Sequence, residues 1–209
     1  MAFGYYMNME RIALDIAKEH VENMTDDNME DDIFLDEEKL KNNVKNGFIV
    51  ITQLIAFIES YLNTILNTCV KYSGKELLKS SIEEKLEIIF LYYKKDLSII
   101  KSQHYWECFR KILKVRNEMI HFKITDIGMG TGIPNFSFAG IEAKSFFTKH
   151  TMQDSIDKII ILGDLIAEEL KLKVFHDINI FECDGVDGLV NYVHDKEAIM
   201  IDESRYKQE

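Results

Sequence analysis

The chain contains a single proline, Pro134, and only ten glycines among its 209 residues. Proline and glycine are the residues that most often end helices and form the tight turns between short strands. A sandwich of many short strands needs far more of both. The sequence therefore favours a mainly α-helical fold, and a hydrophobic content of 46% is enough for one substantial core.

Five segments carry the apolar spacing of amphipathic helices, with hydrophobic residues three or four positions apart. The second is the longest, because it begins near Asp36 and continues through Ile65, with Gly74 as its stop signal. Ser81 and Thr151 are suited to cap the third and fifth helices, which follow them directly. The expected helices cover residues 9–24, 36–65, 81–93, 104–121 and 151–172.

Two stretches lack this helical spacing. Glycines cluster between residues 125 and 141, which indicates a loop with a short strand at its end. Residues 174–209 alternate or cluster apolar residues around the turn-like DGVDG, which predicts a small β-hairpin appendage. We therefore expect an N-terminal helix and acidic segment in 1–39, a helical bundle in 40–172 and a C-terminal appendage in 173–209.

Charge is distributed unevenly along the chain. The net charge of −11 argues against a protein that coats nucleic acid nonspecifically, because such binding depends on many basic side chains. Any contact with RNA must be local. Residues 94–123 are net basic, which fits either a phosphate-accepting surface around residue 116 or a set of solvated helix faces. The basic residues of this stretch are Lys94, Lys95, Lys101, Arg110, Lys111, Lys114, Arg116 and Lys123, against Asp96, Glu107 and Glu118.

Other patterns exclude several classes of protein. The cysteines, Cys69, Cys108 and Cys183, are far apart, so we expect a reducing, cytoplasmic environment. The N-terminus lacks the features of a signal peptide. The apolar stretch 48–66 contains six polar residues, which predicts a buried helix and no membrane partner. No histidines have metal-ligand spacing, so we expect neither a metal site nor a cofactor.

The candidate chemistry lies at the end of the fourth helix, in Arg116, Asn117 and His121. On a helix, Asn117 and His121 are about 40° apart and share a polar face, whereas Arg116 lies near Leu113 and Ile120. An arginine there needs an anionic or hydrogen-bonding partner. The purely structural alternative is that Arg116 pairs with an acid such as Glu118 or Glu59, and that His121 caps the helix C-terminus.

This segment resembles the HEPN family, whose hallmark is an arginine, usually followed by a polar residue, then a histidine after four to six residues near the end of a core helix. Arg116, Asn117 and His121 match this motif. The resemblance extends over roughly residues 40–172. It includes FIESYLNTIL at 57–66, KLEIIFLYY at 85–93 and Trp106, ten residues before the arginine.

The resemblance implies an antiparallel helical bundle that forms a homodimer, in which the two arginine–histidine helices build one composite cleft. It also implies a metal-independent endoribonuclease with RNA as substrate, acting in bacterial or phage-related defence or stress. Arg116 would grip the phosphate and His121 would transfer protons, while Asn117 would orient the histidine or the phosphate by hydrogen bonding. An antitoxin or regulatory protein is a further implied partner, and a noncatalytic dimerisation module is the alternative function.

One position departs from a subgroup of this family. In the HEPN toxins that are silenced by a partner nucleotidyltransferase, a tyrosine commonly lies two positions after the histidine. Here that position is Lys123. The sequence therefore does not favour membership of that subgroup.

Overall fold

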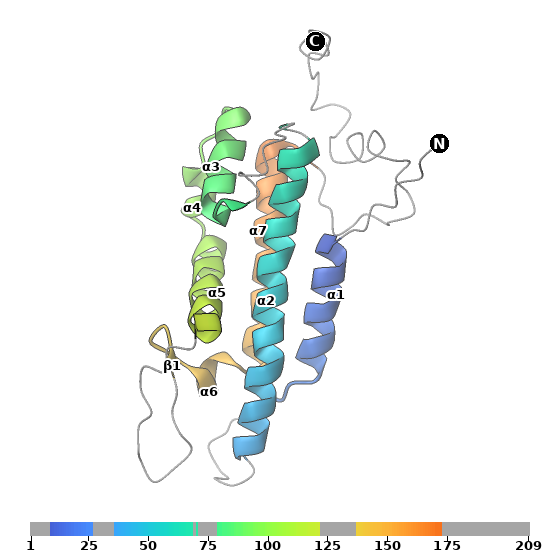
Figure 1. The fold of residues 1–209 in the computed structure, drawn as a ribbon, viewed down its shortest axis with the longest axis vertical. Coiled ribbons are helices and arrows are strands. Elements are labelled where there is room, and N and C mark those ends of the chain that lie inside the picture. The colour runs from blue at the N-terminus through green and yellow to red at the C-terminus, as the bar shows by residue number, and fades with distance from the viewer. Residues whose placement is uncertain (1–8, 27–35, 69, 71–78, 122–136, 173–209) are drawn as a thin grey trace, which may run out of the picture.

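A computed structural model describes residues 9–26, 36–68, 70, 79–121 and 137–172 of the chain (Figure 1). Helices contain 81% of these residues, and one small antiparallel sheet is present. The predicted mainly helical class is therefore confirmed. The C-terminal hairpin expected in 174–209, the stop at Gly74 and most of the acidic segment lie outside the described residues.

The five predicted helices are all present, and their apolar spacing is the reason they could be recognised. They are α1 (Met9–Glu22), α2 (Asp36–Thr68), α3 (Ile82–Tyr92), α5 (His104–His121) and α7 (Lys149–Leu170). Two further helices, α4 (Ser98–Lys101) and α6 (Ala143–Phe146), were not predicted. Each has only four residues, which is too short to show a helical period.

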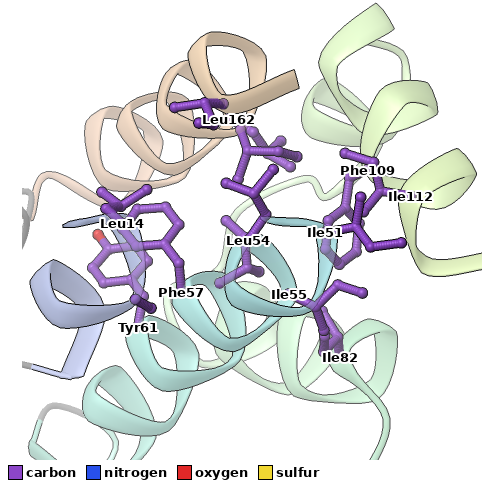
Figure 2. Close-up of a cluster of buried hydrophobic side chains, with 14 of the residues drawn as sticks. Leu14, Ile51, Leu54, Ile55, Phe57, Tyr61, Ile82, Phe109, Ile112 and Leu162 are labelled. Carbon is purple, nitrogen blue, oxygen red and sulfur yellow. The ribbon is translucent and has the colours of Figure 1, made fainter. Parts of the chain in front are cut away.

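Helix α2 is the centre of the bundle and contacts α1, α3, α5 and α7. Figure 2 shows Ile51, Leu54 and Phe57 of this helix among apolar side chains from the neighbouring helices. Residues Glu38–Asn67 are long and apolar enough to cross a membrane by length and composition alone, and 56% of the most apolar window is buried inside the protein. This burial is the packing expected for a core helix, as the sequence predicted.

Helix α1 runs beside α2 (Figure 1) and contributes to the same hydrophobic core. Its buried face carries Ala13, Leu14, Ala17 and Val21. The core therefore continues into the segment that the sequence assigned to a separate N-terminal region. Asn43 of α2 fixes the end of this segment, because its side chain exchanges two hydrogen bonds with the backbone of Thr25, both at 3.0 Å.

The sequence predicted the capping residue of α3 correctly and that of α7 incorrectly. Ser81 caps α3 in a capping box with Glu84, as the serine followed by acids indicated. The cap of α7 is Thr148 and not Thr151, so the predicted cap was wrong. Thr148 accepts a hydrogen bond from the backbone N–H of Thr151 at 3.1 Å. The first turn of α7 is polar, so apolar spacing could not reveal it.

A two-residue turn joins strands β1 (Ser137–Phe138) and β2 (Ile141–Glu142), which pair in antiparallel register. This hairpin confirms the short strand expected at the end of the glycine-containing stretch. Its turn residues, Ala139 and Gly140, have φ values of 58° and 74°. Positive φ at both positions is typical of the turns that match the twist of a hairpin. The preceding residues, 122–136, lie outside the described part.

Candidate functional site

Helix α5 carries the three candidate residues, and its buried face sets their directions. Trp106, Phe109, Ile112 and Val115 are buried, so four residues of the predicted apolar stripe face the core. Residues three or four positions apart lie on one side of a helix, and this side packs toward α2 and α7. The last two turns then place Arg116 at the edge of the core and Asn117 and His121 in solvent.

Arg116 is half-buried and has an unusual set of partners. Its Nη1 donates a hydrogen bond to Oδ1 of Asn117 at 3.0 Å. Its Nε is buried and has no hydrogen-bond partner among the described residues. A buried donor without a partner costs about 1–3 kcal/mol of folding free energy. Stability alone therefore does not favour an arginine at this position.

Neither acid that could have neutralised Arg116 does so in this structure. Glu59 instead accepts an ion-paired hydrogen bond from Nζ of Lys85 at 2.7 Å. Glu118 accepts a hydrogen bond from the backbone N–H of Ala139 in the hairpin turn. The structural alternative of an Arg116 ion pair with Glu59 or Glu118 is therefore wrong.

His121 is the last residue of α5, and its side chain is exposed. It makes no hydrogen bond with the rest of the described chain. Asn117 is exposed on the same face of the helix. Arg116 and His121 are about 140° apart around the helix axis, which places them on different flanks. The structure thus joins Arg116 to Asn117 directly, and leaves His121 one turn beyond Asn117.

A shallow pocket of about 470 Å³ opens on the exposed face of α5, between this helix, the start of α3 and the hairpin. Of the three predicted residues, only Asn117 lines it. The lining of the pocket has a net positive charge, because it includes three cations and one acid. Its lining residues are Glu83, Arg110, Lys111, Leu113, Lys114, Asn117, Ala139 and Ile141.

Tertiary contacts neutralise part of the basic stretch that the sequence contains. Lys95 pairs with Glu169 at 3.1 Å, and Lys101 pairs with Glu87 at 2.9 Å. Among the described residues of this stretch, Lys94 and three residues of α5, Lys111, Lys114 and Arg116, have no ion pair. The sequence fits either a phosphate-accepting surface around residue 116 or solvated helix faces. It does not indicate the pocket, because the hairpin wall of the pocket follows α5 by some twenty residues.

Two other ring side chains of α5 lie away from the three candidate residues. Trp106 is only 4% exposed, so it belongs to the core. His104 begins α5 and stacks on Tyr105, with ring centroids 3.7 Å apart. Within the described residues, no group of three or more histidine, cysteine, aspartate or glutamate side chains is placed to hold a metal ion.

The fold and the site together define a mainly helical bundle with a basic, amide- and imidazole-containing face on one core helix. Comparison with protein-family models, curated proteins and solved structures finds no match to this chain.

Proposed function

We propose that this protein is a cytoplasmic, metal-independent endoribonuclease of the HEPN type, with Arg116, Asn117 and His121 as its catalytic residues. The observation that carries the proposal is the state of Arg116, which is held at the edge of the core by Asn117 and has no carboxylate partner among the described residues. A phosphate is the ligand that a guanidinium in this state is suited to bind.

The chemistry assigned to these residues is an internal transesterification of RNA. The ribose 2′-oxygen attacks phosphorus while His121 takes the 2′-hydroxyl proton, and the bond from phosphorus to the 5′-oxygen breaks. A second imidazole protonates the leaving 5′-oxygen. The products are a 2′,3′-cyclic phosphate and a 5′-hydroxyl, and Arg116 stabilises the negative charge on the phosphate oxygens.

A homodimer supplies the second imidazole in this proposal. Within one chain, Arg116 and His121 lie on different flanks of α5, about 140° apart. Packing the ends of two α5 helices against each other brings the arginine of one copy toward the histidine of the other. Ile120 is 47% exposed beside Arg116 in the single chain, and dimerisation would cover it.

The second candidate function is a noncatalytic HEPN dimerisation module. The exposed Ile120 would serve this function equally, because a dimer contact at the end of α5 does not depend on whether RNA is cut. The two functions differ in what His121 does. A module that only dimerises has no use for a proton-transferring group at that position.

The test is cleavage of tRNA, mRNA and rRNA by the purified full chain in the presence of EDTA. We expect cleavage, with 2′,3′-cyclic phosphate ends. His121→Ala should lower the rate about 10²-fold to 10⁴-fold, which is the usual contribution of a general acid or base. His104→Ala is the matched control, since this exposed histidine lies about 25 Å away on the same helix.

Three outcomes would overturn the proposal. If His121→Ala cuts RNA as fast as the parent, or if the parent cuts none of the three RNAs, the noncatalytic function is the better one. If activity disappears in EDTA and returns with magnesium or manganese, His121 is not the main proton-transfer group.

A further inference from the structure

We propose that the pocket between α5 and the β1–β2 hairpin is a phosphate-binding subsite, which holds the RNA strand on one side of the cleavage site. The inference rests on the proposed ribonuclease function and adds a second, separate part to the site. Arg110, Lys114, Asn117 and His121 lie within about 60° of one another around α5, so they form one stripe along the helix.

The stripe has a consistent order along α5. Lys114 and His121 are about 10 Å apart along the helix axis, and Asn117 lies between them. Asn117 both lines the pocket and binds Arg116. An RNA strand that follows the stripe would therefore meet the pocket cations on one side of His121.

Within the described residues, the cations of the pocket have no close carboxylate partner. Lys114 is exposed and has no ion pair among the described residues. Arg110 approaches Glu83 only to 3.9 Å, and both side chains are about half exposed or more, so this pair is weak. Lys111 lies over the ring of Phe146, 5.2 Å from its centroid, and this contact does not neutralise the ammonium.

The hairpin gives the pocket a fixed wall. Glu118 accepts a hydrogen bond from the backbone N–H of Ala139, which ties the hairpin turn to α5. This contact also directs the carboxylate of Glu118 toward the hairpin backbone. Ile141 and Ala139 are the lining residues that the hairpin contributes. The pocket is thus formed before a ligand arrives, which lowers the entropy lost on binding.

The lining also indicates what part of the RNA is bound. No aromatic residue lines the pocket, so bases have no stacking platform there. Arginine, lysine and asparagine side chains are the usual donors to phosphate oxygens. We therefore expect contacts to the backbone alone, without preference for a base at this subsite.

The test uses a single-stranded 2′-O-methyl oligoribonucleotide of about 12 nucleotides. This probe lacks the attacking 2′-hydroxyl, so the active full chain can be measured without cleavage. Fluorescence anisotropy over a range of salt concentrations would compare the parent chain with the double variant Arg110→Gln, Lys114→Gln. The matched control is Lys41→Gln, Lys45→Gln, which removes the same charge from exposed positions on α2.

We expect the pocket variant to bind about 25-fold more weakly at about 0.1 M salt, and the slope of log K against log salt to fall by about 1.4. The α2 variant should bind like the parent, and mixed base sequences should bind equally well. An unchanged affinity and slope in the pocket variant would overturn the subsite. So would equal loss in the α2 variant, or competition by polyglutamate as effective as that by unlabelled oligonucleotide.

This experiment separates the two proposals. Binding that depends on Arg110 and Lys114 in a chain that does not cut natural RNA would support the subsite and remove the nuclease. Cleavage that depends on His121, together with an unchanged affinity of the pocket variant, would support the nuclease and remove the subsite. Circular dichroism of each variant would verify the fold, which should be intact because all four substituted residues are exposed.

Discussion

The guanidinium of Arg116 donates a hydrogen bond to the side-chain oxygen of Asn117, its immediate neighbour on α5, at 3.0 Å. The same guanidinium has a buried Nε with no hydrogen-bond partner within the described structure. Adjacent helical residues point about 100° apart, so this contact requires the arginine to reach around the helix. Its side chain is therefore positioned by a neutral amide, which leaves its positive charge available to a ligand.

The first prediction is that Arg116→Met separates stability from activity. Removing an unsatisfied buried donor should leave the free energy of unfolding unchanged or raise it by about 1 kcal/mol. Cleavage of RNA should be lost, because the phosphate loses its cation. Urea unfolding and the cleavage assay would measure the two effects. Arg116→Lys is the control, since it keeps the charge but not the planar fork, and should retain only part of the activity.

A contrary result would be as informative. If Arg116→Met lowers the stability by about 3 kcal/mol or more, the arginine serves the fold, as removal of one partner from a buried ion pair does.

The second prediction concerns the dimer. Ile120→Asp places a charge on the exposed apolar residue beside Arg116 and should convert the dimer into monomers. Light scattering should report twice 24.4 kDa for the parent and 24.4 kDa for the variant. Cleavage should fall with the dimer, because each composite site needs two chains.

Leu91→Asp is the control for this charge. Leu91 is 79% exposed at the end of α3, beside the end of the bundle where Lys95 pairs with Glu169. The Leu91 variant should stay dimeric and active. A parent chain that is monomeric at micromolar concentration would contradict the composite site.

The third prediction is a pH dependence of stability caused by Glu10. This carboxyl is buried against α2 and accepts a hydrogen bond from Thr64 at 2.9 Å. Burial raises the pKa of Glu10 above its ordinary value of 4.5. The folded state therefore holds the proton more tightly than the unfolded state, and stability falls as the pH rises from 4.5 through the raised pKa.

Glu10→Gln removes this titration. The variant should match the parent near pH 4 and be more stable at pH 7, by about 1.4 kcal/mol for each unit by which the pKa is raised. Urea unfolding at both pH values would measure the difference. Glu19→Gln, at an exposed position of the same helix, should not change the pH dependence. If Glu10→Gln lowers the free energy of unfolding equally at both pH values, the Glu10 side chain has a packing role only.

The fourth prediction concerns the ion pair between Lys85 and Glu59. The Lys85 side chain is fully buried, and the Glu59 side chain is 43% exposed. Glu59→Gln should destabilise the protein by about 1–3 kcal/mol, because the buried ammonium loses its anionic partner. Lys85→Met should cost less, since a side chain of similar shape then fills the space without a charge.

The pair between Glu87 and Lys101 provides the comparison for thermal or urea unfolding. Its side chains are 36% and 59% exposed for Lys101 and Glu87, so Glu87→Gln should cost under about 1 kcal/mol. If Glu59→Gln and Glu87→Gln lower the free energy of unfolding equally, the burial of Lys85 does not make its ion pair more important for stability.

Local features of the sequence determined the helices and the directions of the candidate side chains. Apolar spacing and a serine cap are contained in a few neighbouring residues, so α3 and α5 were predicted to within one residue at each end. The separation of Asn117 and His121 from Arg116 follows from the geometry of one helix.

The tertiary structure decided which charges remain available and where a pocket forms. The pairing of Glu59 with Lys85 and of Lys95 with Glu169 joins residues 26 and 74 positions apart, which no local pattern indicates. The pocket also needs the hairpin, which Glu118 ties to α5 across 21 positions. Such contacts depend on how separate helices pack, because only packing brings distant residues within hydrogen-bond distance.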